Sequence, residues 1–255
     1  MNDAARQIAA DLAALGVRTG DVLLVHSSLK SLGPAAGGPQ IVIDGLRLAL
    51  GEQGTLLMPA LSYATVGPRQ TTFDVVKTPS CVGAVPEFFR TLPGVTRSVH
   101  PTHSACGEGP RAAELLGRHQ LDTTPCGEHS PFRLLRDAGG KILMLGCGLR
   151  PNTSMHGVEE LAMPPYLLGE PVDYRVILAD GGRAVMNVRR HNFGGTGGTG
   201  YRQRYDRALP LLDASALRAG RVLAARAYLI DAAALWRVAL EALRADPFYL
   251  VEPAQ

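Results

Sequence analysis

The sequence has no stretch of about twenty consecutive apolar residues, the length that a helix needs to cross a membrane. Its start, MNDAARQIAADLAALG, lacks the basic beginning and apolar centre of a secretory signal. The four cysteines stand singly, without a CxxC pair, at Cys81, Cys106, Cys126 and Cys147. These absences predict a reduced protein that acts in the cytoplasm and not at a membrane.

Charge of one sign is also scarce. The formal net charge is only +3, and the excess is not gathered into a basic block, so nucleic acid is not an expected partner. A mild positive balance is compatible with small anionic ligands such as phosphates. Apolar residues make up 46% of the 255 residues, which is enough for a sizeable core. With no internal repeat and no long linker, we expect a single domain over residues 1–255.

Helical and strand-like segments alternate in the first 165 residues. Short apolar runs predict buried strands at residues 21–26, 55–59 and 141–146. This alternation favours an α/β core. Helical spacing and start signals predict helices at residues 3–15, 39–50, 82–92, 110–117 and 130–140.

The pattern changes after Pro165. YRVILADGGRAVMNVRR is two β-rich runs around Asp-Gly-Gly, which predicts a hairpin. RVLAARAYLI (residues 221–230) predicts one strand, and DAAALWRVALEALRADP predicts a closing helix capped by Asp231. The expected fold is therefore α/β, an αβα-type core with a mixed sheet, followed by a C-terminal β-hairpin and a closing helix.

Two loops have the composition of anion-binding sites. VHSSLKSLGPAAGG leaves a strand with Ser27, Ser28 and Ser31 and runs through glycines into a helix start. Backbone N–H groups and hydroxyls in such a place bind phosphate well, although a polar capping loop would have the same composition. Ser80, just before the helix expected to open at Gly83, forms a similar site. Neither loop matches the phosphate-binding pattern GxxxxGK[ST].

Two other patterns suggest ligands but have simpler explanations. His100, His103 and Cys106 recur every three residues, yet Pro101 prevents a helical face and no second ligand pair follows. Hydrogen-bonding loop histidines are favoured there, and no metal is expected. GTGGTG at residues 195–200 matches GxGxxG, but the preceding strand belongs to a hairpin and not to a βαβ unit. A flexible loop or lid is the favoured interpretation.

NTSMHGVEE, residues 152–160, is harder to explain as packing. If a helix begins near Ser154, His156 and Glu159 lie one turn apart on the same face. The carboxylate can then hold one imidazole nitrogen and leave the other as a general base. The alternative is an exposed His–Glu pair of little energetic weight. A serine hydrolase is not indicated, because the sequence has no G-x-S-x-G motif.

Taken in order, HSSLKSLGPAAGGPQIVIDGL, TPSCVGAVPEFFR with PGVTRSVHPTHSACGEG, and CGEHSPFRLLRDAGGKILMLGCGLRPNTSMHGVEE resemble the successive motifs of the aminoglycoside 3-N-acetyltransferase family. The resemblance extends from about residue 15 to 165 and more loosely beyond. It implies an αβα-like fold and transfer of acetyl from acetyl-CoA to an amine. The pyrophosphate motif of GNAT acetyltransferases is not found.

The resemblance also implies roles for individual residues. His156 matches the catalytic histidine of the family, with Glu159 as its partner. The residues expected to face CoA are Ser27, Ser28, Ser31, Ser80, Arg97 and Ser98. We expect direct transfer in a ternary complex, because proximity supplies most of the catalysis. An acyl-cysteine at Cys106 or Cys147 is the weaker option, since the sequence offers neither of them an activating base.

The acceptor is less well defined. Carboxylates suit the polycationic aminoglycosides, and Asp74, Asp122 and Glu160 are candidates to contact them. However, RRHNFGGTGGTGYRQRYDR (residues 189–207) is basic, which favours a neutral or anionic amine. Three functions stay open: acetylation of aminoglycosides, acetylation of another amine, and CoA binding without turnover. The sequence leaves the oligomeric state open, a homodimer included.

Overall fold

The computed structural model describes residues 2–193 and 200–254, and its centre is a seven-stranded sheet. From one edge to the other, the strands are β10 (Leu217–Val222), β11 (Ala225–Asp231), β6 (Lys141–Leu145), β1 (Val22–Ser27), β2 (Thr55–Pro59), β5 (Ala105–Glu108) and β4 (Thr96–Arg97). The three middle strands, β6, β1 and β2, run parallel, while the outer strands join antiparallel. The sheet is therefore mixed, as the sequence predicted.

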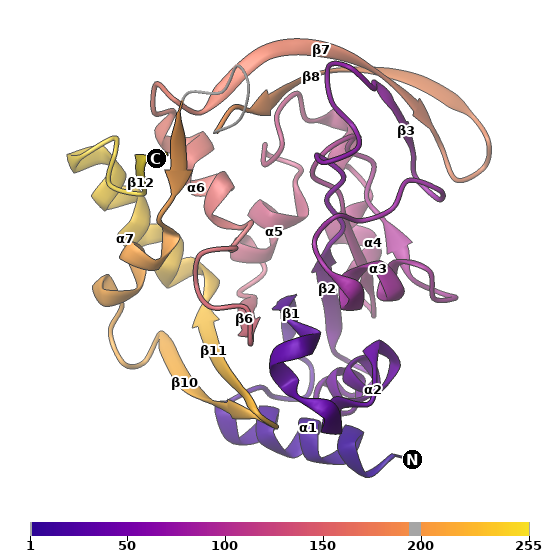
Figure 1. The fold of residues 1–255 in the computed structure, drawn as a ribbon, viewed down its shortest axis with the longest axis vertical. Coiled ribbons are helices and arrows are strands. Elements are labelled where there is room, and N and C mark those ends of the chain that lie inside the picture. Colours follow the sequence, from indigo (N-terminus) through magenta and orange to yellow (C-terminus); the bar gives the residue numbers. More distant parts are fainter. Residues whose placement is uncertain (1, 194–199, 255) are drawn as a thin grey trace.

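Helices cover both faces of this sheet, which explains why its central strands are continuously apolar. Leu23 and Val25 of β1 face one cluster of buried side chains, and Leu24 faces the other. The first face is covered by α1 (Asp3–Leu15), α2 (Pro39–Leu50) and α3 (Ala84–Arg90). The opposite face is covered by α4 (Ala112–Leu116), α5 (Pro131–Asp137), α6 (Met155–Ala162) and α7 (Ala232–Ala245). Figure 1 shows α1 and α2 at the end near the N-terminus, away from α5 and α6.

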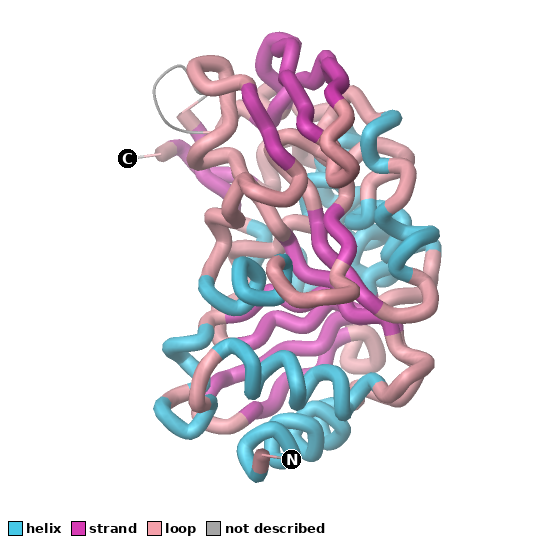
Figure 2. The backbone as a smooth tube through the Cα atoms, turned by 90° about the vertical axis from the view of Figure 1, so that its right-hand side faces the viewer, coloured by secondary structure: helices cyan, strands magenta, loops and turns pink. Residues whose placement is uncertain are grey.

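A second, three-stranded sheet lies at the far end of the molecule from α1 (Figure 1). It consists of β3 (Thr72–Asp74), β7 (Leu168–Ile177) and β8 (Arg183–His191), and it has a small apolar core of its own. β7 and β8 form the hairpin predicted around Asp-Gly-Gly. Figure 2 shows these strands beyond the layered helices and strands of the main core.

The remaining elements are short. β9 (Tyr201–Gln203) pairs antiparallel with β12 (Val251–Pro253). Short 3-10 helices lie at η1 (Leu29–Leu32), η2 (Pro34–Ala36), η3 (His119–Leu121) and η4 (Tyr205–Leu211). Among the described residues, no helix combines the length and apolar character required to span a membrane.

The helices begin and end close to where the sequence predicts. Asp231 caps α7 as expected, because its Oδ1 accepts a hydrogen bond of 2.8 Å from Ala234 N–H. The prediction of one strand over residues 221–230 is wrong, since a tight turn at Leu223 and Ala224 separates β10 from β11. Leu223 adopts a left-handed backbone, φ 49°. This turn contains no glycine, proline or asparagine, so the usual turn signal is missing.

Candidate active site

His156 lies in the first turn of α6, the helix that follows the parallel strand β6. The chain leaves β6 at Gly146 and reaches α6 through Asn152, whose Oδ1 accepts from Ser154 N–H at 3.2 Å. Trp236 of α7 then donates from Nε1 to Ser154 Oγ at 2.8 Å. A Cβ on Gly157 would lie 2.2 Å from the Trp236 ring, so glycine is what lets α6 pack this closely on α7. These contacts fix the position of the histidine.

His156, Glu159 and Tyr205 form a buried hydrogen-bonded triad. Nδ1 of His156 lies 3.2 Å from Glu159 Oε2 and 2.8 Å from the Tyr205 hydroxyl. Tyr205 also donates to Glu159 Oε2 at 2.7 Å. Because Tyr205 has one proton and gives it to Glu159, Nδ1 of His156 must carry a hydrogen. In the neutral imidazole, Nε2 is then the nitrogen that holds the lone pair, which a general base needs.

The Glu159 carboxylate is completely buried and takes a further hydrogen bond from Tyr166 to Oε1 at 3.0 Å. Burial, reinforced by Glu159, raises the pKa of both tyrosines above the usual range. Both hydroxyls thus remain protonated donors at neutral pH. A carboxylate held by two tyrosines and one imidazole is oriented firmly enough to orient the imidazole in turn.

His156 lines a cavity of about 550 Å³. Among the residues that the structure describes, the lining includes three arginines, Arg150, Arg190 and Arg202, and no carboxylate. Arg150 lies 3.5 Å from Asp206 and Arg202 lies 2.6 Å from Glu252, so two of the arginines are paired. The other lining residues are Leu61, Tyr63, Val82, Thr102, His103, Pro151, Asn152, Thr153, His156, His191, Phe193, Gln203 and Tyr205.

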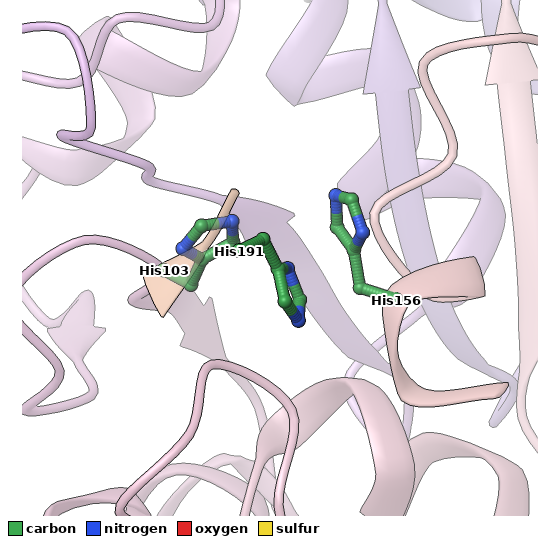
Figure 3. A group of neighbouring side chains, drawn as sticks. All are labelled: His103, His156 and His191. Carbon is green, nitrogen blue, oxygen red and sulfur yellow. The ribbon is translucent and has the colours of Figure 1, made fainter. Parts of the chain in front are cut away.

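Two more histidines lie beside His156 (Figure 3). The rings of His191 and His103 have their centroids 4.4 and 5.5 Å from that of His156. His191 Nε2 lies 2.8 Å from Glu160 Oε1. Burial lowers the pKa of His103 and His191 well below the usual range and raises the pKa of Glu160 to about 7.

The serines expected to face CoA gather where β1 ends. Ser28 Oγ lies 3.0 Å from Ser31 Oγ, and the buried Ser27 Oγ has no hydrogen-bond partner among the described residues. The loop after β6 contacts them, since a Cβ on Gly146 would lie 2.7 Å from Ser31 Cβ. The Ser28 N–H is not free for a ligand, because it donates to Leu145 O at 2.9 Å. Their contact with CoA stays a prediction.

The other three residues expected to face CoA are already bonded within the protein. Arg97 is 8% exposed, and its guanidinium donates to Ser104 Oγ and to backbone carbonyls of neighbouring loops. Ser98 Oγ lies 3.0 Å from His119 Nδ1, also in the interior. Ser80 N–H donates to Glu87 Oε2 at 2.6 Å. The structure thus gives Arg97 and Ser98 a role in holding loops together, and their contact with CoA is untested.

None of the carboxylates proposed for the acceptor lines the cavity. Asp74 accepts from the backbone of Val76 and Lys77 in a turn after β3. Asp122 accepts from His129. Glu160 is buried behind His191 and also accepts from Thr124 and from Cys126 N–H. All three side chains are bonded to protein donors, and their contact with an acceptor stays a prediction.

The sequence did not reveal Tyr166, Tyr205 or His191 as members of this site. Tyr205 lies 49 residues from His156 along the chain, so no local spacing connects them. His103 reaches the site, whereas its sequence neighbour Cys106 is buried on β5 in a different cluster. Of the glycine-rich stretch, residues 194–199 lie outside the described residues, and so does most of the predicted lid.

A family model described as aminoglycoside 3-N-acetyltransferase matches residues 24–244. The aminoglycoside N(3)-acetyltransferase VIII of Streptomyces fradiae is 34% identical in an alignment that covers 91% of this chain and 88% of that protein. The chain belongs to the aminoglycoside 3-N-acetyltransferase family. The resemblance seen in the sequence motifs is thereby confirmed. As a family member, the chain is an acyltransferase, and the acetyl donor of the family is acetyl-CoA.

Solved structures of other members have the same fold. AAC-IIIb in a binary complex with CoASH is 31% identical, with a TM-score of 0.80 over 94% of this chain and 96% of that one. A histidine-to-alanine mutant of aminoglycoside acetyltransferase AAC(3)-IVa, in complex with a gentamicin, is 32% identical. Its TM-score is 0.79 over 97% of this chain and 90% of that one. The predicted αβα-type fold is therefore that of the 3-N-acetyltransferases.

Proposed function

We propose that the protein transfers the acetyl group of acetyl-CoA to the 3-amino group of an aminoglycoside, with Nε2 of His156 as the general base. The observation that supports the mechanism is the triad of His156, Glu159 and Tyr205. Nδ1 is engaged by the two partners, so Nε2 is the nitrogen available to a substrate in the cavity that His156 lines. The four free cysteines fit a reducing compartment, so we place the enzyme in the cytoplasm.

A general base is needed because the acceptor amine is protonated at neutral pH. An alkyl amine with a pKa near that of lysine, about 10.4, is mostly the ammonium ion at pH 7 and has no lone pair. His156 Nε2 takes one proton from the ammonium ion and passes it to solvent, which frees the lone pair. It takes a second proton from the nitrogen as that nitrogen forms its bond to the thioester carbon. The carbon–sulfur bond then breaks, and the proton can pass to the CoA thiolate. Glu159 stabilises the imidazolium that exists between these two transfers.

Direct transfer is favoured over an acyl-cysteine. Burial raises the pKa of Cys106 to about 12 and that of Cys147 to about 11. A thiol in such surroundings supplies almost no thiolate at neutral pH, and the thiolate is the nucleophile. We therefore propose that amine and thioester react together in the cavity, where proximity supplies most of the rate enhancement.

Replacing Tyr205 with phenylalanine should lower kcat by roughly 10- to 150-fold, because a hydrogen bond to a charged group contributes about 1.5–3 kcal/mol. The change removes the hydroxyl that contacts both His156 Nδ1 and Glu159 Oε2. The KM for acetyl-CoA should stay the same, and the pH profile of kcat should shift. Steady-state kinetics from pH 6 to 9 would measure both quantities.

Tyr249→Phe is the matched control for this variant. The Tyr249 hydroxyl donates to the backbone carbonyl of Arg207 at 3.1 Å, outside the triad. Its removal should leave kcat within about twofold of the wild-type value, because the contact is distant from the base. Equal losses in the two variants would show that Tyr205 supports only the fold.

A second acceptor class is favoured by one observation. The cavity lining contains Arg150, Arg190 and Arg202 without a carboxylate among the described residues. A polycation is repelled by such a lining, whereas an amine that carries an anionic group is attracted to it. The same transfer chemistry on an amine of that kind is the alternative function.

A panel of acceptors separates these functions. Gentamicin and sisomicin should be acetylated at the 3-amino group, with kcat/KM at least roughly tenfold above that for 4-aminobutyrate, if the first proposal holds. Mass spectrometry and NMR of the products would identify the acylated nitrogen. A higher kcat/KM for 4-aminobutyrate than for the aminoglycosides would support the alternative. In that case Arg190→Gln should raise the KM for 4-aminobutyrate, and the control Arg226→Gln should leave it unchanged. Binding of CoA without any product would exclude both.

A further inference from the structure

Three buried imidazoles converge at the cavity wall (Figure 3). His103 comes from the loop before β5, His156 from α6 and His191 from the end of β8. One nitrogen from each ring lies within 4.8 Å of the others. The three residues are 6%, 9% and 7% exposed, so bulk water does not separate them.

Each ring has one nitrogen that contacts an oxygen of the protein. His156 Nδ1 contacts Glu159 and Tyr205, and His191 Nε2 contacts Glu160 Oε1 at 2.8 Å. His103 Nδ1 lies 2.9 Å from Thr102 Oγ1. Histidines that bind metals almost always have such a partner behind the ring, most often a carboxylate or another oxygen, which fixes the ring and its tautomer. Here all three have an oxygen partner, and two of the partners include a carboxylate.

The remaining nitrogen of His191 has no explanation within the protein. Its Nδ1 is buried and has no hydrogen-bond partner among the described residues. A buried polar atom left unpaired costs about 1–3 kcal/mol. Because Nε2 faces Glu160, Nδ1 is the nitrogen of His191 that is left for a ligand. A neutral ring nitrogen of this kind can bind an ion that accepts an electron pair.

The donor set matches a divalent transition metal. Three neutral imidazoles suit Zn²⁺ or Co²⁺, with bonds of about 2.0–2.1 Å and nitrogens about 3.3 Å apart in a tetrahedron. The present separations, which are within 4.8 Å, would have to shorten to that value on binding. The Glu159 carboxyl group lies behind His156, and the Glu160 carboxyl group lies behind His191.

We propose that His103, His156 and His191 bind one Zn²⁺ ion, and that the bound ion blocks acetyl transfer. Three protein ligands would leave the fourth position open to the cavity. The second half of the proposal rests on the proposed function, because the ion takes the Nε2 lone pair that His156 uses as a base. The free enzyme is active in this scheme, and Zn²⁺ acts as a reversible inhibitor.

Binding is tested first, without reference to activity. Tag-free, chelator-treated full-length protein is titrated with Co²⁺ while visible absorption is recorded. We expect the intense bands of a tetrahedral site, saturation at one equivalent, and their loss when Zn²⁺ is added. His191→Gln and His103→Gln should each weaken binding by more than about tenfold. His129→Gln removes a histidine that pairs with Asp122 elsewhere, and it should bind as the wild type does.

Circular dichroism of each variant checks that it is folded. Because two ligand positions are replaced separately, the test still works if one of the two variants does not fold. Absence of the bands in the folded wild type, or wild-type affinity in both ligand variants, would overturn the site. Inhibition is measured next, with acetylated product quantified by mass spectrometry so that CoA thiols do not interfere. The Zn²⁺ inhibition constant should equal its dissociation constant, and a chelator should restore the rate. Tight binding with full activity would leave the metal site standing and refute the role of His156 as the base.

Discussion

Replacement of His156 with alanine should lower kcat by roughly 10²–10⁴-fold, the usual contribution of a positioned general base. The acceptor amine would then have to lose its proton to water, which is a weaker base than imidazole. The dissociation constant of CoA should change little, because none of the predicted CoA residues lies on α6. Single-turnover kinetics with saturating acetyl-CoA would measure the chemical step directly.

Two further variants assign the loss to chemistry. His156→Gln keeps most of the side-chain volume beside Glu159 and Tyr205 but has no basic nitrogen, so it should be as slow as the alanine variant. Ser28→Ala should instead weaken CoA binding and leave the chemical step nearly intact. Calorimetry with CoA and a thermal melt of each variant would separate binding, chemistry and folding. Turnover near the wild-type rate in His156→Gln would rule out the base.

Acid should unfold this protein at a pH that most enzymes tolerate. Burial lowers the pKa of His26 and His119 to about 3 and lowers the pKa of three other histidines well below the usual range. The unfolded chain takes up these protons near pH 6.5, whereas the folded chain does not. Stability is therefore present above pH 6.5 and is lost as the pH falls. The five histidines are His26, His100, His103, His119 and His191.

The raised pKa of Glu160, about 7, acts in the opposite sense. Its folded carboxyl binds a proton between pH 7 and 4.5 that the unfolded carboxyl does not, which offsets one histidine. Each uncompensated proton changes the free energy of unfolding by about 1.4 kcal/mol per pH unit. Five histidines less one carboxyl leave four such protons, a loss of about 5.6 kcal/mol per pH unit, against a total stability of roughly 5–15 kcal/mol. The midpoint of acid unfolding should consequently lie at roughly pH 4–5.

His119 provides the matched test. Ser98 Oγ lies 3.0 Å from its Nδ1, and its Nε2 lies 3.1 Å from the carbonyl of Pro125, an arrangement that fits the neutral ring. His119→Gln should reduce the pH slope of the unfolding free energy by about 1.4 kcal/mol per unit below pH 6. Urea unfolding at pH 8, 6 and 5 would give the slopes, with the pH 8 difference as the baseline. Parallel curves for the two proteins would contradict the assignment.

The sequence predicted the central architecture well and the complete site poorly. β1, β2 and β6 are buried on both faces, so their apolar runs are visible without any knowledge of the fold. His156 and Glu159 were found because a helix brings residues three apart onto one face. Tyr205 and His191 reach the same point through tertiary packing, which local periodicity does not encode. A hydrogen-bonded pair within one helix is therefore predictable, and the tertiary contacts around it are not.

Charge was a weaker guide than spacing. Asp74 and Asp122 were plausible contacts for a polycation by composition, yet each serves a local turn or loop. Arg97 looked like a phosphate ligand, yet its donors join three backbone carbonyls and a serine in the interior. Only the three-dimensional structure reveals whether a charged group already has hydrogen-bond partners within the protein. The missed turn at Leu223 has a similar origin, because its backbone is imposed by the strands on either side.

The position of β1 in the middle of the sheet has a consequence for synthesis of the chain. β1 pairs with β6 through Leu23–Lys141 to Ser27–Leu145, and Lys141 also bonds Asp21, 120 residues earlier. At about 5–20 residues per second, a ribosome needs roughly ten seconds to deliver β6 after β1. During that interval the emerging chain carries an apolar strand with one open edge, a template for unwanted pairing. We therefore expect the nascent polypeptide to need protection from such pairing before β6 and His156 have been translated.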